Sequence, residues 1–194
     1  MLGFTNHFKF KTMKIELKKI SFNERMSEET NCFVADLYID GKNVGICKND
    51  GHGNRTDYRG DYRGDYRGDY RGDTKDDNIV IAKAEEYCKT LPKEVMFGKE
   101  WEVTLEDVIN KKFDEYIMAK MKAKTKKKML KQQEYSILFG IPNSNTYQIL
   151  KYNVLLSQIT KPQLQIFVDK VNERYCTNGV EILNTNLQAL GIEL

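Results

Sequence analysis

The chain has 194 residues, of which 40% are hydrophobic and 30% are charged, and its 31 basic and 28 acidic side chains leave a net charge of +3. This composition excludes wholesale disorder, and the length allows one well-packed domain or two small subdomains that share an interface. No apolar run reaches the roughly 18 residues that cross a bilayer, and no secretory signal is recognisable, so we expect a cytoplasmic protein with no membrane partner.

The first part of the chain predicts antiparallel strands after a peripheral extension. Residues 1–12 are aromatic and basic, and we expect them to lie outside a single α+β domain that spans residues 13–194. An Asp-Gly turn at Asp40-Gly41 predicts a hairpin. This register places the apolar side chains of both strands on one face, and a slip by one residue would expose them. They are Phe33, Ala35, Leu37, Ile39, Val44 and Ile46.

A tandem repeat follows the hairpin and a short loop. Four copies of Asp-Tyr-Arg-Gly occupy residues 57–72, and Asp73 follows them. The repeat has no apolar period, and a glycine at every fourth position penalises a helix. We therefore expect residues 57–73 to form an exposed loop or ribbon inserted in the domain.

Two helices are predicted in the middle of the chain. The first covers about residues 76–91 and ends before Pro92. Thr104 and Asp107 form an acidic capping box for a long amphipathic helix over about residues 105–132. The expected buried stripe of this helix consists of Leu105, Val108, Ile109, Phe113, Tyr116, Ile117 and Met121.

The carboxyl-terminal third predicts strands and one more helix. Residues 135–141 and 146–152 have the pattern of two strands about a turn, and residues 180–183 suit a third strand. Thr160 with Gln163 forms a second predicted capping box, at the start of a helix. The complete pattern predicts the α+β class, with an antiparallel amino-terminal hairpin sheet, a long central amphipathic helix and a mixed carboxyl-terminal part.

The clearest charge feature is a lysine cluster at the end of the long helix, with no carboxylate among its members. Seven ammonium groups within about three turns create a positive field that can bind phosphates, and such binding weakens steeply with salt. A solvated helix end, where cations also complement the helix dipole, explains the same pattern. The seven residues are Lys120, Lys122, Lys124, Lys126, Lys127, Lys128 and Lys131.

The repeat has three interpretations. A neutral insertion that arose by slippage of a short nucleotide unit is tolerated wherever a loop is exposed. An arginine and tyrosine ribbon could instead stack on bases or on multivalent partners. The third interpretation is the Arg-Gly-Asp tripeptide that integrins recognise, which a chain without an export signal is not expected to present. The arginines of the repeat are Arg59, Arg63, Arg67 and Arg71.

The loop at residues 49–53 is the best candidate for a small-ligand site. Its glycines permit a close backbone approach, and Asp50 with His52 could form an acid–base or metal pair, with Asn49 beside them. Asp-Gly and His-Gly are equally ordinary turn sequences. The chain has no P-loop, GxGxxG, HExxH, GxSxG or EF-hand motif, and its four cysteines are widely spaced. We therefore expect no cofactor and no metal, and we favour a non-enzymatic role.

Two stretches carry a resemblance to known proteins. KIELKKISFNERMSEETNCFVADLYIDGKNVGICKNDGHG, at residues 14–53, and YCTNGVEILNTNLQALGI, at residues 175–192, resemble small accessory proteins of bacterial phages and other mobile elements. The resemblance implies a protein that acts inside a bacterial cell, on host machinery. It implies no particular activity and no functional residues.

Three functional hypotheses follow. The first is a protein that binds nucleic acid through the lysine cluster, with the repeat arginines as further contacts. The second is an inhibitor or modulator of a host protein, with the hairpin edge or the loop near Gly51 as its contact surface. The third is a small-ligand binder or an enzyme that uses residues 49–53. The first two rank nearly level, ahead of the third.

Overall fold

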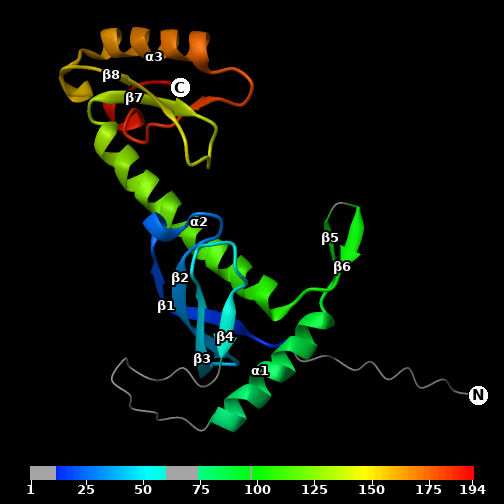
Figure 1. Ribbon diagram of the computed structural model, residues 1–194. Helices are drawn as coiled ribbons and strands as arrows, with labels where there is room; N and C mark the ends of the chain where they lie inside the picture. Colours follow the sequence, from blue (N-terminus) through cyan, green and yellow to red (C-terminus); the bar gives the residue numbers. More distant parts are fainter. Residues whose placement is uncertain (1–11, 60–73, 97) are drawn as a thin grey trace, which may run out of the picture. The chain divides into compact units, whose positions relative to one another are not determined.

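The computed structural model describes residues 12–59, 74–96 and 98–194, and the chain divides into two compact units, Met1–Glu115 and Tyr116–Leu194 (Figure 1). The prediction that residues 13–194 form a single domain stays a prediction. The predicted α+β class is confirmed. Within the described ranges, no helix combines the length and the apolar character that crossing a membrane requires.

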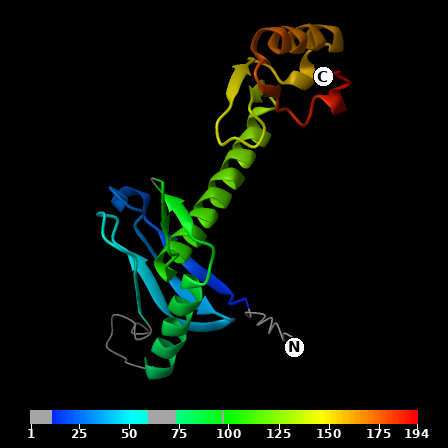
Figure 2. The ribbon, with the colours of Figure 1, turned by 90° about the vertical axis from the view of Figure 1, so that its right-hand side faces the viewer.

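The first unit is built on a four-stranded antiparallel sheet in the order β1-β2-β3-β4. Helix α1 lies against β2 and β3 in both views (Figures 1 and 2). The elements of this unit are β1 (Ile15–Phe22), η1 (Glu24–Met26), β2 (Phe33–Ile39), β3 (Lys42–Asn49), β4 (Asp57–Arg59), α1 (Thr74–Lys89), β5 (Glu94–Met96), β6 (Lys99–Trp101) and the first part of α2 (Leu105–Gln132).

The predicted hairpin is confirmed, with one correction. Asp40 and Gly41 have φ values of 47° and 83°, as a tight turn between twisted strands requires, and Ile39 pairs with Lys42. A register shift follows, because Leu37 pairs with Gly45 whereas Tyr38 pairs with Asn43, which leaves Val44 as an extra residue. Beyond this bulge the alternation is reversed. Cys47 is therefore buried, and the prediction that Ile46 lies on the core face is wrong.

The repeat begins as a strand rather than as a loop. Residues 57–59 of its first copy form β4, in which Tyr58 pairs with Cys47 of β3. The expectation of a loop from residue 57 onward is thus wrong for these three residues. Residues 60–73 lie outside the described part of the chain, as do residues 1–11 of the predicted extension.

The bounds of the long helix and its capping box are confirmed. Thr104 N donates to Asp107 Oδ2 at 2.8 Å, and Asp107 N donates to Thr104 Oγ1 at 3.2 Å. The buried stripe is shorter than predicted, since it consists of Leu105, Ile109 and Phe113 alone. Met121, which the helical spacing predicted to be buried, is 48% exposed.

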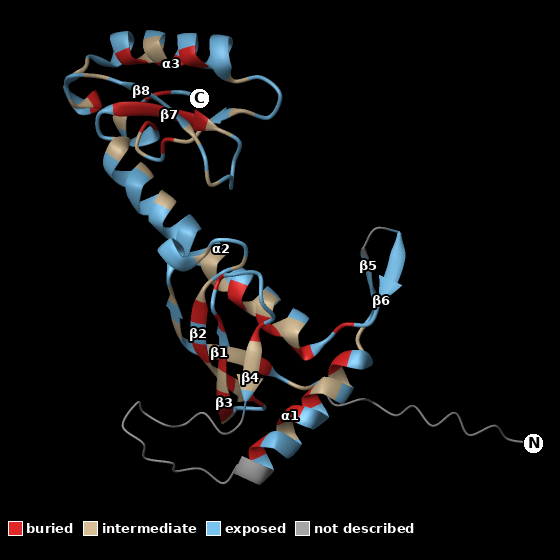
Figure 3. Cartoon of the chain, in the orientation of Figure 1, coloured by how far each residue is buried: buried red, intermediate tan, exposed pale blue. Residues whose placement is uncertain are grey.

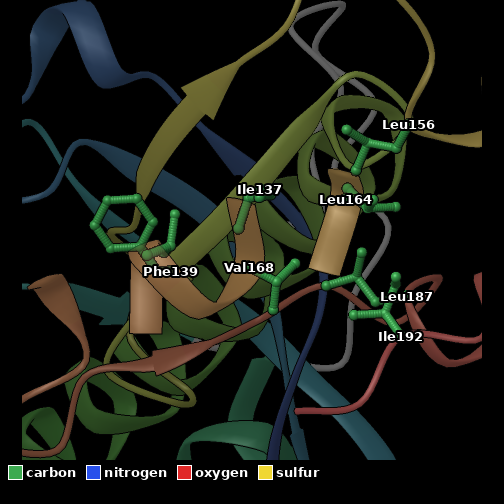
Figure 4. Close-up of a cluster of buried hydrophobic side chains, with 8 residues drawn as sticks. Ile137, Phe139, Leu156, Leu164, Val168, Leu187 and Ile192 are labelled. Atoms are coloured by element: carbon green, nitrogen blue, oxygen red, sulfur yellow. The ribbon is translucent and has the colours of Figure 1, made fainter. Parts of the chain in front are cut away.

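The second unit places a buried strand under a helix. β7 lies at the centre of a three-stranded antiparallel sheet, β8-β7-β9, and the buried side of α3 faces it (Figure 3). Figure 4 shows side chains from β7, α3 and the carboxyl-terminal segment in one cluster, which includes Ile137, Val168 and Ile192. Its elements are the rest of α2, β7 (Ser136–Gly140), β8 (Gln148–Lys151), η2 (Leu156–Gln158), α3 (Lys161–Tyr175), β9 (Glu181–Ile182) and η3 (Gln188–Leu190).

The second predicted capping box is wrong. Thr160 is the residue that caps α3, but its side chain makes no hydrogen bond to the helix backbone. The Thr160 hydroxyl instead donates to Gln163 Oε1 at 2.9 Å. The two box-like sequences of this chain are therefore not equivalent, and only the one at Thr104 satisfies free backbone N–H groups.

Candidate nucleic-acid interface and the polar loop

The second half of α2 presents seven exposed lysines, and its helical period sorts them into two groups. At 100° per residue, five of them fall within about 100° of the helix circumference, and they extend over about 16 Å of its axis. We call this set the lysine face; it consists of Lys120, Lys124, Lys127, Lys128 and Lys131. Lys122 and Lys126 lie on the other side of the helix.

The charges of the lysine face are not neutralised within the described part of the chain. None of its five lysines forms an ion pair there, whereas Lys89 and Lys112 pair with Glu86 and Glu115. Lys120 Nζ lies 5.8 Å from the centroid of the Tyr116 ring. These ammonium groups are thus available to an anion.

Spacing within the lysine face also creates repulsion. Lys120 and Lys124, Lys124 and Lys128, and Lys127 and Lys131 are pairs at i and i+4. Each like-charge pair at this spacing destabilises a helix by about 0.2–0.5 kcal/mol. A polyanion bound along the face would relieve this cost.

Only the first arginine of the repeat lies in the described part of the chain. Arg59 Nε donates to Asp57 Oδ1 at 3.0 Å, so its charge is locally compensated. Tyr58 OH donates to Glu85 Oε1 at 2.9 Å, and burial raises the pKa of Tyr58 well above its usual value. This first tyrosine is therefore engaged within the fold. The remaining arginines of the predicted ribbon, Arg63, Arg67 and Arg71, lie outside the described residues.

In the loop after β3, Asp50 organises the turn. Its carboxylate accepts from Asn54 Nδ2 at 2.9 Å and from His52 N at 3.2 Å, and these bonds lower the pKa of Asp50. The His52 ring is directed elsewhere, with Nδ1 3.3 Å from Glu28 Oε2. These bonds support the interpretation of residues 49–53 as an ordinary turn rather than as an acid–base or metal pair. Within the described ranges, no group of three or more His, Cys, Asp or Glu side chains is placed to hold a metal ion.

Asn49 is a buried organiser of the same loop. Its Oδ1 accepts from Thr30 Oγ1 at 2.7 Å and from Gly51 N at 2.9 Å. Its Nδ2 donates to Asn54 O at 2.9 Å and to Thr56 Oγ1 at 3.2 Å. All hydrogen-bonding positions of this amide are thus used, so Asn49 shapes the loop and has no free group for a ligand.

Gly51 is required where it stands. Its φ is 89°, and its carbonyl oxygen accepts from the N–H groups of Glu28, Glu29 and Thr30. A Cβ at this position would overlap Met26 O. The glycine that the sequence suggested for ligand approach therefore serves the contact between two loops.

A pocket of about 370 Å³ lies beside this loop, within the first unit. One wall is the loop itself, with Asn54 and Arg55, and the other is α2, with Glu106, Asn110 and Asp114. Our sequence reasoning missed the three helix residues. Their spacing of i, i+4 and i+8 was the signal, because it places three polar side chains on one face of a predicted helix.

The wall residues are tied to one another through Thr56. Its backbone N–H donates to Glu106 Oε1 at 2.8 Å, and its hydroxyl donates to Asn110 Oδ1 at 2.6 Å. Asn31 Nδ2 donates to Asp114 Oδ1 at 3.3 Å. These bonds fix the helix wall against the loop.

Comparison with known proteins adds nothing to this geometry. No family model matches the chain, and no curated protein or solved structure is significantly similar to it. The resemblance to accessory proteins of phages therefore stays an expectation.

Proposed function

We propose that this chain is a non-enzymatic binding protein that contacts nucleic acid through the lysine face of α2. The observation that carries the proposal is the alignment of five exposed ammonium groups over about 16 Å of one helix, none of them ion-paired within the described residues. Phosphate oxygens along a nucleic-acid backbone provide the matching row of negative charge.

Such binding is driven by the release of counterions from the nucleic acid. If each lysine of the face neutralises one phosphate of a duplex, the logarithm of the binding constant falls with the logarithm of salt concentration with a slope of about −4.5. Between 50 and 200 mM salt the affinity then falls about 500-fold. Because these contacts reach the backbone rather than the base edges, we expect little dependence on base sequence.

The helix offers matched variants for testing this interface. Lys124→Gln with Lys127→Gln removes two charges from the lysine face, whereas Lys122→Gln with Lys126→Gln removes two from the other side. The first pair should reduce the magnitude of the slope, of the logarithm of the binding constant against the logarithm of salt concentration, by about 1.8. This is the change expected for the loss of two phosphate contacts. The second pair should leave it nearly unchanged.

The measurement is a fluorescence anisotropy titration of a labelled duplex and a labelled single strand, at several salt concentrations between 50 and 200 mM. Far-ultraviolet circular dichroism confirms that all variants retain their helix content. An equal loss from both pairs would show that net charge, not the lysine face, governs binding. No binding at 50 mM salt would refute the proposal and favour the hypothesis of a host protein target.

A further inference from the structure

The pocket beside the loop after β3 combines opposite charges that do not neutralise each other. Arg55 lines it from the loop, and Glu106 and Asp114 line it from α2. Arg55 is exposed and forms no ion pair with any described residue, although two carboxylates share the pocket with it. A volume of about 370 Å³ lies within the range of small-molecule sites.

We propose that this pocket binds a small zwitterion, a molecule with an ammonium group at one end and a carboxylate at the other. The carboxylate meets the Arg55 guanidinium, whose planar fork matches two carboxylate oxygens. The ammonium group meets Glu106 and Asp114, where its three N–H donors find acceptors. This site is separate from the lysine face and does not depend on the proposed nucleic-acid function.

The helix wall keeps free hydrogen-bonding atoms in fixed positions. Glu106 and Asp114 each use one oxygen in the bonds to Thr56 N and Asn31 Nδ2. The second oxygen of each carboxylate has no partner among the described residues, and neither has Asn110 Nδ2. A wall that is already held in place loses little further entropy when a ligand binds.

The mixed charge of the lining favours a zwitterion over an ion of one sign. A simple cation would be attracted by the two carboxylates but repelled by Arg55. A simple anion would be attracted by Arg55 but repelled by Glu106 and Asp114. A ligand with both groups is attracted at each end, by Arg55 on the loop wall and by the two carboxylates on the helix wall. The stacked rings of Phe33 and Phe113, with centroids 4.1 Å apart, contribute an apolar part of the lining that suits a short methylene chain.

Three probes of equal chain length separate these cases: 6-aminohexanoate carries both charges, hexylamine only the positive one and hexanoate only the negative one. Isothermal titration calorimetry on the full chain should show that 6-aminohexanoate binds at least about tenfold more tightly than either analogue, since a hydrogen-bonded charge pair contributes that much. Glycine, 4-aminobutyrate and 6-aminohexanoate together then report the distance between the two subsites.

Variants assign each end of the ligand. Arg55→Gln should weaken 6-aminohexanoate about tenfold and leave hexylamine unchanged or tighter, because it removes the repulsive guanidinium. Glu106→Gln with Asp114→Asn should weaken 6-aminohexanoate and strengthen hexanoate. Both substitutions keep an oxygen that can accept from Thr56 N and Asn31 Nδ2, so the wall should stay in place.

Arg25→Gln is the matched control, since Arg25 is an exposed arginine of the same unit that does not line the pocket. It should leave the binding of every probe unchanged. The proposal is overturned if no probe gives saturable heat up to about 50 mM. It is overturned equally if hexylamine or hexanoate binds as tightly as 6-aminohexanoate, or if Arg25→Gln weakens binding as much as Arg55→Gln does.

Discussion

The two halves of α2 have the same backbone conformation for different reasons. Residues 105–115 include the three buried side chains of the helix and begin at a formed capping box. Residues 116–132, all of which the structure describes, include no buried side chain. They consist largely of Ala, Lys, Met and Leu, which favour a helix intrinsically. Tertiary packing thus explains the sequence of the first half, whereas it does not explain why the second half accumulates repelling lysines.

The largest effect that tests this difference is expected from removing a large side chain from each half of α2. Phe113 is 1% exposed, its ring stacks on that of Phe33, and the Phe22 ring lies 5.5 Å away. Phe113→Ala should lower the free energy of unfolding by about 3–5 kcal/mol, because it leaves a cavity in the core. Met121→Ala, at a side chain that is 48% exposed, is the control and should cost less than about 1 kcal/mol. Urea denaturation monitored by circular dichroism measures both, and similar losses would refute the contrast.

The start of the helix provides a second, smaller test. Thr104→Ala removes the capping hydroxyl of α2 and should cost about 1 kcal/mol in urea denaturation. Thr160→Ala removes the equivalent hydroxyl of α3, which caps no backbone group, and should cost a few tenths of a kcal/mol. Equal losses at the two positions would show that the hydrogen bonds of the Thr104 box do not stabilise α2.

The smallest expected effect concerns the second half alone. Lys124→Gln removes two repulsive pairs, with Lys120 and Lys128, and should stabilise the helix by about 0.4–1 kcal/mol at low salt. Lys122→Gln removes only the pair with Lys126 at this spacing and should give about half the gain. Thermal denaturation at 20 mM and 500 mM salt measures the effect, which should shrink at high salt. A loss of stability at low salt would mean that the lysines are not a local cost of folding.

Turns and helix ends were predictable from the sequence, whereas the orientation of side chains after a β-bulge was not. The Asp40-Gly41 turn, the Thr104 box and the bounds of α2 depend on neighbours within a few positions, and the sequence predicted them correctly. The equally local box at Thr160 was predicted wrongly. The bulge at Val44 could not be predicted, because it inserts one residue without any break in the apolar pattern. It reversed the predicted orientation of Ile46 and placed Cys47 in the core.

The two candidate sites also differ in how far the sequence predicts them. The lysine cluster is contiguous in sequence, so composition alone identified it, and helical spacing then separates the lysine face from Lys122 and Lys126. The pocket joins Asn31, Arg55 and Asn110 through residues that are far apart in the chain, as the bond between Thr56 and Asn110 illustrates. The spacing of the three helix residues is a local pattern, but their meeting with the loop residues depends on the fold and could not be predicted from the sequence.

Because the first Asp-Tyr-Arg-Gly copy forms β4, a change in the number of copies concerns the segment that follows Thr56. Every copy has the same sequence, so a duplication or loss of one unit leaves an identical Asp-Tyr-Arg directly after Thr56. The segment that pairs with β3, and the tyrosine that reaches Glu85, are regenerated whichever copy is deleted. A change in the number of copies therefore leaves the sequence of β4, including its tyrosine, unchanged.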